Sequence, residues 1–160
     1  MKKNLPIIVG VGLVVIIAIG LSMMGKSGTT TDRTAREVAL TCTTDMATKF
    51  HIHPNLEIRF DGEVQTMPAD VGILPNCMYS LHTHTADGIL HVEAPEKKDF
   101  TLSDFFAVWD KPFSKTEILD KKTGDTHRIR VTVNGEEVST YEHTLLVDAD
   151  KIVIFYEAIP

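Results

Sequence analysis

The order of apolar and polar positions separates an N-terminal apolar run from a longer part that alternates in short segments. The run from Leu5 to Met24 has twenty residues and no charge. A helix of that length spans about 30 Å, the thickness of the hydrocarbon core of a bilayer. No Ala-x-Ala-like cleavage site of a signal peptide follows it. We therefore expect residues 1–24 to form a transmembrane helix that anchors the chain.

Charged and small residues flank this run. Lys2 and Lys3 precede it and Lys26 follows, which favours an N-terminus inside the cell and the rest of the chain outside. Residues 25–34 are small and polar, with three consecutive threonines, and predict a flexible stalk. The expected location is the cell membrane, with a single pass and residues 35–160 as a domain outside the cytoplasm.

Beyond position 50 the alternation of apolar and polar residues is typical of β-strands. Favoured two-residue hairpin turns separate successive segments at Asp61-Gly62, Asp87-Gly88 and Asn134-Gly135. The segments that we expect to be strands are residues 56–60, 63–67, 78–84, 89–94, 126–133, 136–140 and 151–157.

Three stretches depart from this alternation. Residues 35–50 have spaced apolar residues and several threonines, which allow a helix or a strand. Residues 68–76 are bracketed by prolines and predict a connecting loop. Thr101 can cap a short helix that ends near Lys111-Pro112. The expected fold class is mainly β: an N-terminal transmembrane helix plus a small antiparallel β-sandwich or partly open barrel with one short helix.

The charge distribution limits the function. All 22 Asp and Glu residues follow position 31, together with 13 of the 16 Lys and Arg residues, which gives this part a net charge of −9. Such a domain repels nucleic acid and attracts metal cations. The chain also has no Gly-rich phosphate loop, nucleophile elbow or zinc-finger cysteine spacing. We therefore expect no nucleic-acid partner and no nucleotide or acyl-transfer chemistry.

The histidines are concentrated in one region. Five of the seven lie between positions 51 and 91, as two His-x-His pairs and one His-x-Glu. Side chains two residues apart share one face of a strand, so a hairpin over residues 81–93 would gather several of them. Imidazole is the commonest transition-metal ligand. The predicted metal ligands are His82, His84, His91, His51, His53 and Glu93, and the expected cofactor is a copper or zinc ion.

The two pairs allow one metal centre or two neighbouring ones. The histidines of residues 81–93 form the first set, and His51 and His53 either complete it or form a second. Glu93 and Asp87 would accept hydrogen bonds from imidazole N–H groups and so orient the rings. A metal-free alternative is a ladder of hydrogen-bonded histidines that stabilises the sheet and protonates below about pH 6.5.

The two cysteines, Cys42 and Cys77, lie in the part that we expect outside the cytoplasm, where disulfides persist. A disulfide between them would stabilise the domain by about 3 to 4 kcal/mol. The alternative is that Cys77, which precedes His82 closely, is a thiolate ligand of the metal.

Five short motifs surround the histidines: His-x-His-Pro, Leu-x-Ile, Pro-Ala-x-x-Gly-Ile, Cys-x-x-x-Leu-His-Thr-His and Gly-x-x-His-x-Glu. Together they resemble a family of membrane-anchored or secreted proteins of archaea and bacteria, and the resemblance extends from residue 51 to the Phe-Phe-x-x-Trp at 105–109. In this chain the motifs are residues 51–54, 56–58, 68–73, 77–84 and 88–93.

The resemblance implies a shared metal site on the outer face of a membrane, and it brings no agreed activity with it. The chain departs from the family pattern at one place. The family has Asp directly after His-Thr-His, whereas this chain has Thr85, and Asp87 is the nearest replacement.

Three functions are compatible with these features. A binding module would capture or deliver copper or zinc at the outer membrane face, or act as an accessory subunit of a larger membrane metalloenzyme complex. An enzyme would use three histidine ligands, an open coordination position and Glu93 or Asp87 as base on a metal-bound water. A metal-free structural domain would dock on a partner. The anchor, the acidic surface and the number of histidines favour the binding module.

Overall fold

Strands predominate in the computed structural model, which describes residues 32–45 and 48–160. The mainly β character expected of the domain is confirmed. The predicted membrane anchor, residues 1–24, and residues 25–31 of the predicted stalk lie outside the described residues. None of the helices in the described ranges is long and apolar enough to span a membrane.

The helical elements are α2 (Ala35–Ala39), α3 (Leu102–Val108) and the 3₁₀ helix η1 (Tyr141–His143). The strands are β1 (Phe50–Ile52), β2 (Asn55–Phe60), β3 (Glu63–Gln65), β4 (Ile73–Leu74), β5 (Cys77–Met78), β6 (Leu81–His82), β7 (His91–Ala94), β8 (Phe113–Ser114), β9 (Glu117–Ile118), β10 (Lys121–Lys122), β11 (His127–Val133), β12 (Glu136–Val138) and β13 (Lys151–Ala158). In the described part of the chain these strands form four separate sheets.

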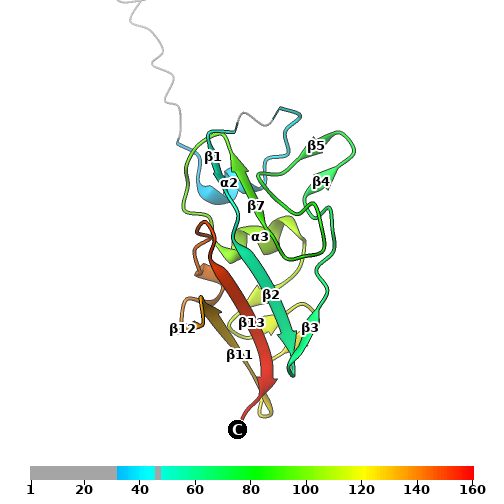
Figure 1. The fold of residues 1–160 in the computed structure, drawn as a ribbon, viewed down its shortest axis with the longest axis vertical. Coiled ribbons are helices and arrows are strands. Elements are labelled where there is room, and N and C mark those ends of the chain that lie inside the picture. The colour runs from blue at the N-terminus through cyan, green and yellow to red at the C-terminus, as the bar shows by residue number, and fades with distance from the viewer. Residues whose placement is uncertain (1–31, 46–47) are drawn as a thin grey trace, which may run out of the picture. The chain divides into compact units, whose positions relative to one another are not determined.

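The largest sheet has five strands in the order β12-β11-β13-β2-β3. The alternation predicted for β2 is confirmed, because Leu56 and Ile58 are buried and their sequence neighbours are less so. These two residues lie opposite Ile152 and Ile154 of β13. Strands β2 and β13 are parallel and lie side by side in Figure 1, whereas the expectation was an antiparallel fold. A parallel pair needs a long connection, and here most of the domain lies between the two strands.

Two of the three predicted hairpin turns are confirmed. Asp61-Gly62 joins β2 to β3 and Asn134-Gly135 joins β11 to β12. All four residues have positive φ, as the type I′ turn requires. The sequence pattern was sufficient at these turns because the two-residue connection fixes the register of the paired strands.

The third predicted turn, Asp87-Gly88, is wrong. Strand β6 ends at His82 and β7 begins at His91, so residues 83–90 form a longer loop. The hairpin expected over residues 81–93 does form, because β6 and β7 pair antiparallel, but this longer loop joins them. The loop also bonds to the start of β2: Leu56 N–H donates to the carbonyl of Gly88 at 2.8 Å. Gly88 has φ +83°, and a Cβ there would lie 2.4 Å from the Leu56 carbonyl oxygen. This contact holds the loop against the five-stranded sheet.

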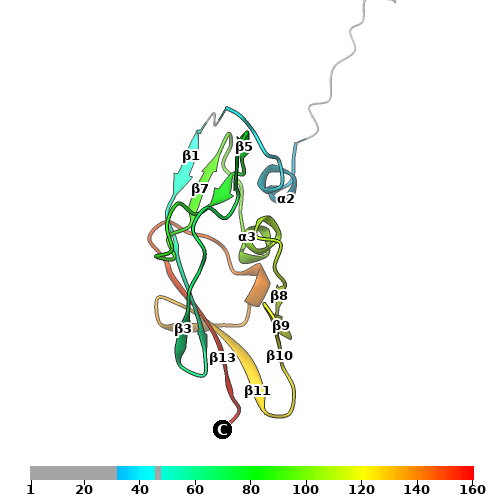
Figure 2. The ribbon, with the colours of Figure 1, turned by 90° about the vertical axis from the view of Figure 1, so that its right-hand side faces the viewer.

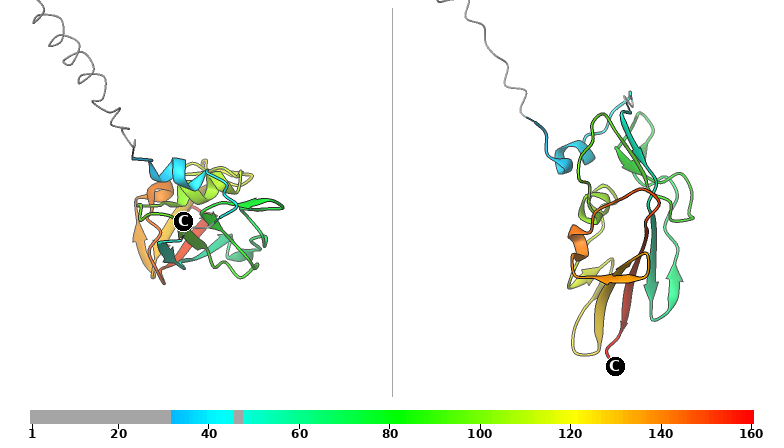
Figure 3. Two further views of the ribbon diagram at one scale, coloured as in Figure 1. Left: turned by 90° about the horizontal axis from the view of Figure 1, so that it is seen from above. Right: turned by 60° about the vertical axis from the view of Figure 1, so that its left-hand side comes forward.

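The predicted short helix is confirmed as α3. Its N-terminus is capped by Thr101 and Asp104, and the Thr101 amide donates to Asp104 Oδ2 at 2.9 Å. Phe105 and Phe106 of α3 are buried in the core. Figure 2 shows α2, α3 and β8–β10 on one side and β1, β7 and β3 on the other, and the right panel of Figure 3 shows the same separation. The core lies between these two layers.

The segment before the histidines differs from its predicted loop. Residues 73–78 form the small hairpin of β4 and β5. Cys77 of β5 forms a disulfide with Cys42, with a Cα–Cα distance of 5.4 Å. The disulfide prediction is thus confirmed, and the alternative of Cys77 as a metal ligand is wrong because its sulfur is already bonded. Residues 35–50, which allowed a helix or a strand, contain helix α2 and the start of β1.

We expect Gly88→Ala to destabilise the domain by at least about 3 kcal/mol, because the new methyl group meets backbone and φ is positive. Gly62→Ala is the matched control. Gly62 has φ +90° but nothing within 4 Å of a Cβ, so its cost should be about 1 kcal/mol. Urea unfolding of the two variants measures both. Equal losses would contradict the contact between the loop and β2.

Candidate metal centre

The site is built on the three-stranded sheet β1-β7-β6. Along β7, Val92 and Ala94 are buried in the core, so His91 and Glu93 project from the opposite face. In the register of the sheet His82 of β6 lies directly opposite His91. The sheet therefore brings residues from three strands to one face, as the His-x-His and His-x-Glu patterns predicted.

Strand β1 adds the first histidine pair to this face. His51 lies opposite Glu93 in the register, and its Nε2 is 3.2 Å from Glu93 Oε1. His53 follows directly after β1, and its backbone N–H donates to Asp148 Oδ1 at 2.8 Å. The pairing of β1 with β7 is the contact that sequence reasoning missed, because none of the strands expected from the sequence covers residues 51–55.

His82 is the buried residue of the cluster, with no exposed surface. Its Nδ1 lies 3.0 Å from the carbonyl oxygen of Tyr79. A carbonyl only accepts, so Nδ1 carries the proton and Nε2 of the neutral ring keeps its lone pair. A backbone carbonyl that fixes the tautomer in this way is typical of metal-binding histidines. No sequence pattern could have identified the Tyr79 carbonyl, because any residue supplies one.

His84 lies beyond the end of β6 but still reaches His82. The two Nε2 atoms are 3.2 Å apart, and the rings meet edge to face. In the metal-free chain one of these nitrogens donates to the other. Two nitrogens bound to one tetrahedral zinc ion at 2.0–2.1 Å lie about 3.4 Å apart. The spacing of the pair is therefore close to what a shared ion requires.

His91 lies at the centre of the cluster. Its ring centroid is 4.6 Å from those of both His84 and His53, and its ring is stacked on His82 at 5.4 Å. Its Nδ1 is buried and has no hydrogen-bond partner among the described residues; Glu93 Oε1 is 3.7 Å away. A buried nitrogen without a partner is costly, so this atom is suited to a ligand that the chain itself does not supply.

The ligand atoms form two groups, within each of which all atoms lie within 4.8 Å of one another. We call them the inner group, which contains the buried His82, and the outer group, which contains the exposed pair of β1. The inner group is His82, His84, His91 and Glu93, and the outer group is His51, His53 and His91. The structure thus brings together all six residues that the sequence singled out as ligands, and His91 belongs to both groups.

Asp87, which the sequence suggested as a partner of the imidazole rings, and the two remaining histidines lie apart from these groups. Asp87 Oδ1 accepts the backbone N–H of Ile89 at 3.1 Å, and within the described ranges Asp87 belongs to neither group. A hydrogen bond with Thr85 lowers the pKa of Asp87. His127 is stacked on Tyr156. His143 is largely exposed, next to Glu142. These histidines are suitable controls for the cluster.

Burial controls the protonation of the cluster. It lowers the pKa of His82 to about 4, although the Tyr79 carbonyl and Glu93 both favour the charged ring. Burial also lowers the pKa of His91, and the neighbouring His53 and His84 add to the effect. Both rings are therefore neutral near pH 7. Neutral imidazole is the form that binds a metal.

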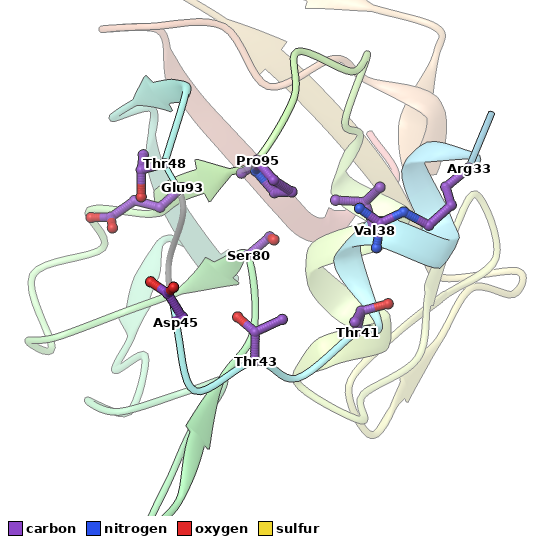
Figure 4. Close-up of a pocket in the computed structure, with 10 residues that line it drawn as sticks. Arg33, Val38, Thr41, Thr43, Asp45, Thr48, Ser80, Glu93 and Pro95 are labelled. Carbon is purple, nitrogen blue, oxygen red and sulfur yellow. The ribbon is translucent and has the colours of Figure 1, made fainter. Parts of the chain in front are cut away.

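A cavity of about 210 Å³ lies beside the cluster. Glu93 and Ser80 line it together with Arg33 and Asp45. In Figure 4 Glu93 lies at one margin of this cavity and Arg33 at the opposite one. Glu93 therefore borders both the histidine cluster and a cavity of the size of a small molecule.

No family model matches this chain, and no curated protein and no solved structure matches it. The family resemblance of the histidine motifs therefore stays a prediction. Function has to be inferred from the geometry of the cluster itself.

In the metal-free chain, we expect the free energy of unfolding to fall as the pH is lowered from about 7.5 to about 5, because of the low pKa of His82. Above its ordinary pKa of about 6.5 the ring is neutral in both states. Below that value the unfolded chain takes up a proton that the folded chain excludes until about pH 4. The His82 contribution to the free energy of unfolding should therefore drop by about 2 kcal/mol between about pH 7.5 and about pH 5.

Urea unfolding after chelator treatment measures this drop, with His82→Asn as the reference. Asparagine offers the Tyr79 carbonyl an N–H but does not titrate. Over the same interval the variant should lose about 2 kcal/mol less than the wild type. Parallel curves for the two proteins would show that His82 does not titrate as its burial requires.

Proposed function

We propose that this protein binds a copper or zinc ion and captures or delivers it at the outer face of a membrane. The observation that carries the proposal is the inner group, in which four ligand atoms lie within 4.8 Å of one another. Three nitrogens and one carboxylate oxygen are a common donor set for zinc and for copper(II). In His82 the tautomer is already the one that ligation requires.

Unequal exposure of the ligands favours reversible binding over a permanent structural role. His82 has no exposed surface, whereas His84, which belongs to the same inner group, is exposed. An ion bound between them would be held from within the fold and still be reachable from solvent. The net charge of −9 beyond position 31 also raises the local concentration of cations.

The choice between the two ions depends on supply. At equal access, affinity follows the usual order of divalent metals and favours copper over zinc. The histidine-rich set has no thiolate, because the two cysteines form a disulfide. The cluster is therefore better suited to copper(II) or zinc than to copper(I), which typically binds at sites rich in thiolates.

The membrane location is part of the proposal and is supported by the uncharged run from Leu5 to Met24. A domain tethered at the outer face would receive ions from outside and pass them to a larger membrane metalloenzyme complex in the same bilayer. The resemblance of the histidine motifs to membrane-anchored or secreted proteins supports the same placement.

Metal-assisted hydrolysis is the second candidate function, and the cavity beside Glu93 is the observation that favours it. A small substrate there would lie next to a carboxylate that also belongs to the inner group. Glu93 is the better candidate base, because Asp87 is bonded within its own loop. Turnover of a small ester by the zinc-loaded chain, lost in Glu93→Gln, would favour this function over delivery.

The decisive measurement is metal content by mass spectrometry on the full chain, purified in detergent without chelator and dialysed. We expect at least one ion of copper or zinc per chain. The double variant His82→Ala, His84→Ala should lose about one ion per chain, since two removed ligands weaken binding by more than the ~100-fold that a lost orienting partner costs.

The control is His127→Ala, His143→Ala, which removes two histidines away from the cluster and should keep the wild-type content. Far-ultraviolet circular dichroism verifies that every variant is folded. A folded wild type that holds neither ion, even after incubation with copper(II) and zinc salts, would contradict the proposal and leave a metal-free histidine ladder as the interpretation.

A further inference from the structure

We propose that the cluster holds two metal ions side by side, one in the inner group and one in the outer group, with His91 as the ligand that they share. The proposal rests on the proposed function, because it requires that the inner group binds a metal. It goes further in assigning a second ion to His51 and His53. It also assigns His91 a role that a single centre does not need.

The positions of the ligand atoms do not converge on a single point. Among the described residues, His51 and His53 share a group only with His91, and neither belongs to the inner group. The inner group already offers four ligand atoms, which is the number that a tetrahedral ion takes. His51 and His53 are therefore not needed by an ion in the inner group, and their distance from His91 suits a second ion.

His91 lies between the two groups. Its ring centroid is equally distant, at 4.6 Å, from His84 of the inner group and His53 of the outer group. Both neighbours meet it edge to face. The buried Nδ1 lacks a partner among the described residues. No other histidine of the cluster has neighbours of both groups at this spacing.

If His91 binds both ions, each of its two ring nitrogens must bind one of them. The reason is that each ring nitrogen has one lone pair and binds one ion. Binding of the second ion then displaces the remaining ring proton to solvent and leaves an imidazolate with one negative charge. That charge lies between the two cations and reduces their mutual repulsion.

Glu93 supplies a second negative charge at the same place. It belongs to the inner group, and its Oε1 is also 3.2 Å from Nε2 of His51 in the outer group. Two adjacent cations need this kind of compensation, which a cluster of neutral imidazoles alone would not provide. The acidic residue of His-x-Glu thus lies where a pair of ions requires it.

The two positions differ in access. The inner position includes His82, which is fully buried, and the outer position includes His51, whose side chain is 48 % exposed. The outer ion should exchange faster, and the inner ion should be retained longer. The outer position is thus the one from which a partner or a chelator takes an ion first.

Copper(II) chloride is the probe for the test. The full chain is loaded with an excess, freed of unbound ions by gel filtration, and analysed for copper content and by electron paramagnetic resonance. We expect two ions per chain and a resonance intensity well below that of two isolated ions, because spins that share an imidazolate couple. His51→Ala, His53→Ala should bind one ion with the full intensity of an isolated centre.

His51 and His53 are both exposed, so we expect that variant to keep its fold. His127→Ala, His143→Ala is the matched control and should retain two coupled ions. His91→Ala should abolish the coupling whatever its remaining copper content. One ion per chain in both the wild type and His51→Ala, His53→Ala would overturn the second site while the proposed function stands. Two ions with full intensity would overturn the sharing. No bound copper would overturn both proposals.

Discussion

The pairing of β1 with β7 is the contact on which the cluster depends. It places His51 opposite Glu93, across forty-odd residues of chain, and so joins the two histidine motifs into one arrangement. A slip of the pairing by one residue would turn His51 to the other face of the sheet. The buried residues Ile52 and Val92, which lie opposite each other in the same register, prevent that slip because it would expose them.

The cluster also has a cost for the fold, because it buries polar side chains beside the apolar core. His82 is among the largest fully buried side chains, next to Leu81, yet an imidazole has two polar atoms that need partners. Tyr79 satisfies one and His84 the other. His91 has an unsatisfied nitrogen on the same face. The apolar face of the sheet therefore stabilises the fold, whereas the opposite face holds a buried nitrogen without a hydrogen-bond partner among the described residues. A bound cation would supply that partner.

Local patterns allowed strands β2, β3, β6, β7 and β11–β13 and the cluster to be predicted, whereas β1, β4 and β8–β10 were not expected. Long-range contacts decide how the strands pair, and local patterns do not specify these contacts. Asp61-Gly62 forms the two-residue turn between β2 and β3, whereas Gly88 bonds to Leu56 of β2, and there the same dipeptide is part of a longer loop. The parallel neighbours β2 and β13 lie far apart in sequence, and no periodicity specifies such a partner. The candidate ligands could be identified from the sequence because His-x-His spacing is local. Their division into two groups depends on how three strands meet.

The disulfide affects how the domain must be produced and when the segment that carries the histidines can complete its fold. Cys77 lies just before the strand of His82, and its bond to Cys42 ties that segment to the chain after α2. Protein made in a reducing cytoplasm would lack this cross-link next to the histidines, so secretion into an oxidising compartment is the appropriate route for its production. At the location that we propose, outside the cytoplasm, the same bond would make completion of the fold follow export, so that the histidines are assembled where the proposed metal ion is encountered.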